Sequence, residues 1–120
     1  MSTSGNLPAA PAIPLSDDLQ AAYKNLYDKL EAEYQSTADP TVLGAIGPIR
    51  DNVENILTND AMYKFNQDSA LFATLKQQIS SATDGLKTLQ TQINATASHF
   101  KTAADILGAI SKVFGVLGVL

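Results

Sequence analysis

The sequence contains no cysteine, no tryptophan and a single histidine among its 120 residues. Without cysteine there is no disulfide scaffold, no Cys-ligated metal site and no thiol chemistry. One imidazole disfavours His-pair metal sites and most histidine-dependent catalytic triads. Signatures of phosphate-binding, dinucleotide-binding and EF-hand loops are also missing. We therefore predict no cofactor, no metal, no small-molecule substrate and no enzymatic activity.

Basic side chains are few as well. Eight Lys and Arg against twelve Asp and Glu give a net charge of −4, which argues against a general nucleic-acid binder. The charge is uneven, because residues 1–60 hold nine acidic and three basic side chains, whereas residues 61–120 hold three acidic and five basic ones. The two halves could attract each other within one fold or present opposite charges to partners.

The N-terminal segment differs in composition from the rest of the chain. Pro8, Pro11 and Pro14 favour extended backbone, so we expect residues 1–15 to form a disordered tail before a single helical domain over 16–120. This segment lacks a cationic start and an unbroken apolar run. We expect no cleavable secretory leader, which fits either a cytoplasmic protein or one exported without such a leader.

Hydrophobic residues make up 45% of the chain, enough to bury a core, and they recur with a helical period. Ser16 is a good N-cap, and an apolar stripe at spacings of three and four predicts a helix over about 16–35. The stripe consists of Leu19, Tyr23, Leu26, Leu30 and Tyr34.

A second helix is predicted over about 40–57. Asp39 is a natural N-cap, and proline is favoured at the first helical position that follows it. Pro48 lacks an amide hydrogen, so we expect a kink or a restart there. Thr58-Asn59-Asp60 resembles a stop, and a third helix is predicted over 60–83.

The second half of the chain carries a sustained heptad. From Phe72 to Leu117, fourteen positions alternate steps of three and four without a slip, and thirteen of them are apolar. One continuous helix over this segment would be about 70 Å long. The alternative is a turn at Asp84-Gly85 that separates 60–83 from a last helix over 85–118. The predicted fold is an all-α bundle of three or four helices, elongated if the last two are continuous.

Few residues are candidates for chemistry. None of the helical neighbours of His99 is a ligand or an orienting carboxylate, so we interpret it as a surface or interfacial residue. Asp51 and Glu54 share a helical face but lack the Glu-and-His pairs of di-iron bundles. They indicate a solvated acidic face.

Two rows of side chains are candidate docking surfaces. The tyrosines of the first helix suit either packing at the core edge or a stripe for a partner. Four lysines separated by 11, 14 and 11 residues would fall within about 40° of one another on one unbroken helix. They either solubilise that face or dock to an anionic surface, whether the acidic half, a partner or lipid headgroups. The residues concerned are Tyr23, Tyr27 and Tyr34, and Lys76, Lys87, Lys101 and Lys112.

The segment Ala103–Leu120 is the most unusual part of the sequence, with Asp105 and Lys112 as its only charges. Large apolar residues form a seam, and small residues beside it permit close helix approach. Its length and Asp105 favour an interfacial or buried helix over a membrane span. Locally, Ile106–Val116 resembles short cationic, glycine-containing membrane-active peptides. The residues predicted to mediate membrane contact or self-association are Ile106, Leu107, Gly108, Ile110, Val113, Phe114, Gly115, Leu117 and Gly118.

These features predict a non-enzymatic helical interaction protein. It would self-associate or engage a membrane through its C-terminal segment, in its sharpest form as a toxin-like or translocator-like component. Its partner would be a second copy, another helical protein or membrane lipid. The alternative is a soluble structural or adaptor bundle that buries this segment in its own core and has no membrane role.

Overall fold

A computed structural model describes residues 13–118, so residues 1–12 of the tail predicted over 1–15 lie outside the described residues. Four α-helices follow one another, with a short 3-10 turn, η2, before the last of them. Their bounds are α1 (Asp17–Ser36), α2 (Pro40–Asn66), α3 (Ser69–Ala95), η2 (Ala97–His99) and α4 (Ala103–Leu117). Residues 13–118 include no strand, and the predicted all-α bundle is confirmed.

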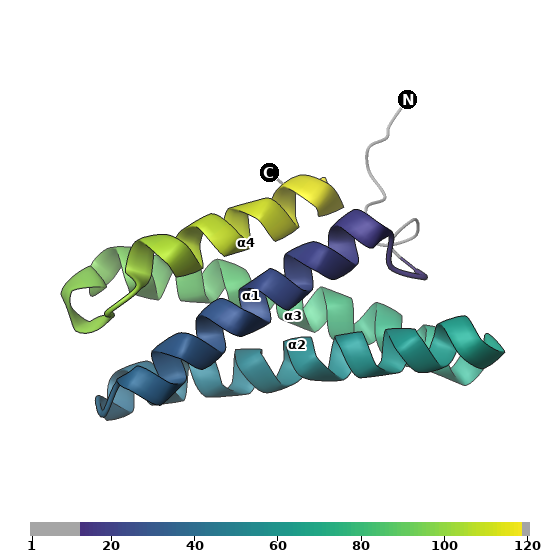
Figure 1. Cartoon of the computed structure of the whole chain (residues 1–120), viewed down its shortest axis with the longest axis horizontal. Helices are drawn as coiled ribbons and strands as arrows, with labels where there is room; N and C mark the ends of the chain where they lie inside the picture. Colours follow the sequence, from purple (N-terminus) through teal and green to yellow (C-terminus); the bar gives the residue numbers. More distant parts are fainter. Residues whose placement is uncertain (1–12, 119–120) are drawn as a thin grey trace.

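The helices form two layers, as Figure 1 shows. Helices α2 and α3 lie side by side as a long antiparallel hairpin, and α1 crosses this hairpin next to α2. Helix α4 packs mainly on α1 and also touches α3. The bundle measures 41 × 32 × 20 Å.

The core is built from the predicted apolar stripes. On α1, Ser16 caps the helix through its hydroxyl, which accepts the Leu19 N–H, and four of the five stripe residues are buried. Tyr34 is the half-buried fifth. Along α3 the heptad positions from Leu75 to Ile93 are all buried. The seam that the heptad predicts is therefore the inner face of α3.

The predicted end of the second helix is wrong. Helix α2 continues through Pro48 and through Thr58-Asn59-Asp60 to Asn66. The side chains of Asn59 and Asp60 do not cap a new helix, because they bond to other segments. Asn59 Nδ2 donates to Gln78 Oε1 on α3 at 3.0 Å. Asp60 accepts the Leu15 N–H at 2.8 Å.

Both predictions for the last part of the chain are wrong. The heptad segment is not one helix, and it does not turn at Gly85, which lies in the middle of α3. A Cβ at Gly85 would stand 3.5 Å from Ile49 Cγ1, an ordinary contact distance, so this glycine lies where α3 packs against α2. The chain turns instead over Thr96–Thr102, which we call the linker. Contacts with α1 and with the α1–α2 turn hold the linker in place, as described below.

The predicted disorder of the whole segment 1–15 is also wrong where the structure describes it. Ile13 and Leu15 are buried in the core, and Leu15 is 3% exposed. Asp60 of α2 is itself buried and pairs with Lys64 Nζ at 2.9 Å while accepting the Leu15 N–H. The segment before α1 is therefore part of the packed structure from residue 13 onward.

Candidate functional site

Helix α4 has two contrasting faces. Its large apolar side chains point into the bundle, so the predicted membrane or self-association residues of this class are buried, apart from the half-buried Leu107. The buried ones are Ile106, Ile110, Val113, Phe114 and Leu117. The small residues lie on the opposite, exposed face: Gly108, Gly115 and Gly118. The nine predicted residues therefore do not form one surface.

The exposed face of α4 carries glycines at two helical positions, Gly108 and Gly115. A Cβ at Gly108 would meet no atom within 4 Å, so no packing in this bundle requires glycine there. Gly118 differs, because its φ of +80° ends the helix in the left-handed region that favours glycine. Val116 on this side is 41% exposed. The face offers close approach to a neighbour but little apolar area of its own.

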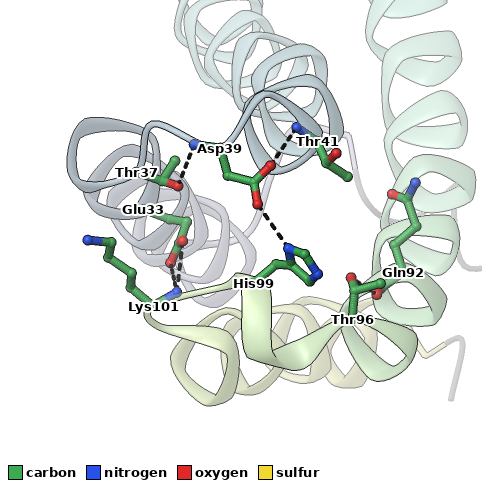
Figure 2. Close-up of polar contacts among 8 residues, drawn as sticks. All are labelled: Glu33, Thr37, Asp39, Thr41, Gln92, Thr96, His99 and Lys101. Atoms are coloured by element: carbon green, nitrogen blue, oxygen red, sulfur yellow. Dashed lines mark hydrogen bonds and ion pairs between the residues drawn. The ribbon is translucent and has the colours of Figure 1, made fainter.

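A buried carboxylate holds the linker at the start of α4 (Figure 2). Glu33, near the end of α1, is fully buried. Its oxygens accept the Lys101 N–H at 2.9 Å, the Thr102 N–H at 2.8 Å and the Thr102 hydroxyl at 2.7 Å. Thr102 is the N-cap of α4 but makes no capping bond with its own side chain. Glu33 of α1 therefore caps the N-terminus of α4. The dipole of α4 also favours a negative charge at this end.

A second carboxylate holds the linker from the α1–α2 turn. Asp39 caps α2 by accepting the Thr41 N–H at 2.9 Å, and its other oxygen lies 2.9 Å from His99 Nδ1, which donates to it. The hydrogen bonds from His99 and from Thr41 lower the pKa of Asp39 below its ordinary value. Phe100, next in the chain, is buried in the core.

His99 therefore does have a carboxylate neighbour, although it comes from a different part of the chain. The imidazole is 53% exposed and the Asp39 side chain 30%. The pair joins two turns at one end of the bundle, in agreement with an interfacial position for His99. Among residues 13–118 no three His, Asp or Glu side chains converge closely enough to hold a metal ion.

The roles of Glu33 and Asp60 were not predicted from the sequence. Their position in register with the apolar residues of their helices is the signal that could have revealed them. Glu33 follows Leu26 and Leu30 at the spacing of the apolar stripe on α1. Asp60 follows Val53 and Ile56 in the same way on α2. A charged residue in phase with a buried stripe is expected to be buried and paired.

The three tyrosines of the predicted partner stripe do not share one free surface. Tyr23 is fully buried, and burial raises its pKa. Tyr34 packs beneath Arg50, whose guanidinium carbon lies 3.9 Å from the ring centroid, and Arg50 Nη1 bonds to Glu31 at 3.0 Å. Tyr27 is half-buried between α1 and α2, where burial and the charge of Glu54 raise its pKa. Most of this stripe is therefore occupied by packing against α2.

The predicted alignment of the four lysines on one helix is wrong, because the linker interrupts it. Lys76 and Lys87 lie on α3, Lys101 is in the linker and Lys112 is on α4. All four are exposed. An electrostatic role for them stays a prediction, but without the shared stripe.

Two shallow grooves flank α1. One of about 400 Å³ lies between α1 and α4 and is lined by Asn25 and Lys112, among others. Another of about 340 Å³ lies between α1 and α2 beside Tyr27 and Leu57. Val116, which is 41% exposed, lines the first groove, and Phe65 at the tip of the α2–α3 hairpin is 89% exposed.

Comparison with known proteins gives no identity. No protein-family model, curated protein or solved structure matches this chain.

Within the part of the chain that the structure describes, no helix combines the length and the apolar character needed to cross a membrane.

Proposed function

We propose that this protein is a non-enzymatic helical interaction protein that acts through α4, by self-association or by contact with a membrane. The observation that carries this proposal is the composition of α4 on both faces. Its inner face is a row of large apolar side chains, and its outer face holds Gly108 at a position where no contact within the bundle requires glycine. Glycine inside a helix costs about 1 kcal/mol relative to alanine. A neighbour that packs closely on this face would account for that cost.

Membrane contact in this proposal needs α4 to turn its inner face outward. The apolar side chains would then be transferred from the bundle to the lipid interface, where Lys112 and Lys101 could meet anionic headgroups. Burial of apolar surface, at about 25 cal/mol per Å², would drive both this contact and self-association. In its sharpest form the protein is a toxin-like or translocator-like component.

The experiment compares free α4 with α4 held in the bundle. The variant Asn25→Cys/Lys112→Cys places two thiols on the walls of one groove, in a chain that has no other cysteine. A short bis-maleimide would tie α4 to α1. The uncrosslinked double variant should float with anionic vesicles or show concentration-dependent light scattering, and crosslinking should abolish the flotation. If the uncrosslinked form stays a monomer and does not float, this function is wrong.

A second candidate function is a soluble structural or adaptor bundle. It is favoured by the complete burial of Ile106, Ile110 and Val113, which gives α4 a role in the core. In that case the crosslinked and uncrosslinked forms should behave alike in flotation and scattering. A chain that ends at Thr102 should then lose stability without any change in vesicle binding.

A further inference from the structure

The linker has no residue that requires a turn. Its sequence, Thr-Ala-Ser-His-Phe-Lys-Thr, contains neither glycine nor proline, the residues that usually mark a change of direction. Thr96 has φ −133° and ψ 39°, and Thr102 has φ −127° and ψ 43°, so neither terminus lies in the left-handed region. Two local backbone hydrogen bonds shape the turn, from the His99 N–H to Thr96 O and from the Phe100 N–H to Ala97 O, and tertiary contacts fix its direction.

The heptad pattern continues through this turn. Ile93, Thr96, Phe100, Ala103 and Leu107 follow one another at steps of three, four, three and four. If the linker were helical, the seam of α3 would run into the seam of α4 without a change of face. A helix from Ser69 to Leu117 would be about 70 Å long at 1.5 Å per residue, whereas the longest dimension of the bundle is 41 Å.

The side-chain contacts that hold the end of the turn come from two acids in the first half of the chain. The Glu33 carboxylate bonds to Lys101 and Thr102, and Asp39 bonds to His99. These contacts compete with the helical conformation that the linker sequence permits. Straightening the linker would break them, remove α4 from its seat on α1 and α3, and expose both the seat and the inner face of α4.

We propose that α4 exchanges between two copies of this chain. The linker straightens, α3 and α4 become one helix, and α4 of each copy occupies the seat on α1 and α3 of the other. This inference rests on the proposed function, of which it specifies the self-associating form and its partner. Exchange of an identical element between copies is a known low-cost route to a symmetric dimer.

The surface of α1 and α3 that binds α4 in the closed bundle fits α4 of a second copy, because the two copies have the same sequence. In the bundle, α3 and α4 are antiparallel neighbours (Figure 1). Two straight helices that cross antiparallel at their linkers place α4 of one copy beside α3 of the other, antiparallel to it as in the closed bundle. The side chains that pack in the closed bundle, among them Ile110 and Phe114, would therefore meet the same neighbours in the dimer.

The first test measures dimer formation. The full chain is unfolded and refolded at increasing concentration, and its mass is determined by size-exclusion chromatography with light scattering. The dimer fraction should rise with concentration and should rise further, at least threefold, in Glu33→Gln, because one closed-state acceptor is weakened. Glu54→Gln is the matched control, since Glu54 is exposed and distant from the linker in sequence.

A proline variant tests whether the linker straightens. Ala97 is the first residue of η2, a position that suits proline, but proline at this site in a continuous helix would remove a hydrogen bond and clash with the preceding turn. Ala97→Pro should lower the dimer fraction at least tenfold at unchanged helical content. If Ala97→Pro does not fold, the double variant Ala97→Gly/Ser98→Gly should lower it for the same reason. A dimer that persists in the folded variants overturns the proposal.

The decisive test distinguishes exchange from simple surface contact. Chains carrying only Asn25→Cys are mixed with chains carrying only Lys112→Cys, refolded together and treated with a short bis-maleimide. Exchange brings the two thiols together across copies and yields covalent pairs of one chain of each kind. Dimers without such pairs overturn the exchange but leave the proposed self-association intact. If wild-type and Glu33→Gln chains stay monomeric at every concentration, exchange is wrong, and vesicle flotation then decides the proposed function separately.

Discussion

The Glu33 carboxylate accepts the Thr102 N–H at 2.8 Å, although 69 positions separate the two residues in the chain. It also accepts the Thr102 hydroxyl and the Lys101 N–H. A fully buried acid on one helix thus fixes the start of another.

Replacing Glu33 with alanine should lower the free energy of unfolding by about 1–3 kcal/mol, because it leaves the buried N–H groups of the linker without an acceptor. Urea denaturation monitored by circular dichroism measures this change. Glu54→Ala, on an exposed position of α2, should change stability by less than about 0.5 kcal/mol. Equal losses in the two variants would contradict a capping role for Glu33.

Asp39 should give the protein a distinct dependence on acid. Its pKa is lower in the folded chain than in the unfolded chain, chiefly because of the hydrogen bond from His99. The folded state therefore binds fewer protons, and stability from Asp39 is fully present above the unfolded pKa, about 4, and is lost as pH falls through the lower folded value. Asn is an equally good N-cap, so Asp39→Asn removes the charge and keeps the cap.

The measurement is the difference in unfolding free energy between wild type and Asp39→Asn at several pH values below 5. That difference should shrink as pH falls. Asp84→Asn, on an exposed position of α3, serves as the control. A difference that stays constant from pH 5 to pH 2 would show that Asp39 gains nothing from its charge.

The glycines of α4 should respond in opposite directions to alanine. Gly108→Ala should stabilise the protein by about 0.5–1 kcal/mol, because a Cβ there meets nothing within 4 Å and alanine favours the helix. Gly118→Ala should destabilise it, since the φ of +80° is strained for any residue with a Cβ. Thermal unfolding of both variants beside wild type checks the two signs. A destabilised Gly108→Ala would reveal a contact on that face.

The Tyr23 hydroxyl is buried and has no hydrogen-bond partner among the described residues. Burial of an unpaired hydroxyl is costly, so Tyr23→Phe should leave stability unchanged or raise it by about 1 kcal/mol. Denaturant unfolding gives the value, and Tyr63→Phe on the half-exposed hairpin tip is the control. A loss above about 1 kcal/mol in Tyr23→Phe would mean that the hydroxyl has a partner.

Leu15 lies before the first helix and yet is 3% exposed. Leu15→Ala should cost about 2–4 kcal/mol, as for other large-to-small changes in a core. Urea denaturation of Leu15→Ala beside wild type measures it. A cost below about 0.5 kcal/mol would indicate that the segment before α1 is not packed in solution.

Helical periodicity was sufficient to predict the all-α fold and the buried stripes, because the spacing of apolar residues directly determines which face of a helix packs. The ends of the helices were harder to predict from the sequence. Asp60 has the chemistry of a cap, but its carboxylate accepts the N–H of Leu15, which is distant in sequence, and pairs with Lys64 one turn further along the same helix. Gly85 has the chemistry of a break but lies inside α3, beside Ile49 of α2.

The turn at Thr96–Thr102 could not be predicted from local sequence for a related reason. Its determinants, Glu33 and Asp39, lie more than fifty residues earlier in the chain. The sequence does mark Glu33 as a charge within an apolar stripe, but not which segment its carboxylate contacts. The candidate site at this end of the bundle is therefore a product of tertiary structure.

Asp60 and Glu33 perform the same task at opposite ends of α1. Each is a buried acid that accepts backbone N–H groups from a non-helical segment, one from Leu15 and the other from the linker. The bundle thus has two separate contacts of this kind, and we expect each to open independently of the other. Native-state hydrogen exchange should resolve two cooperative units of different stability, one with the segment before α1 and one with the linker and α4. Glu33→Gln should accelerate exchange in the second unit alone.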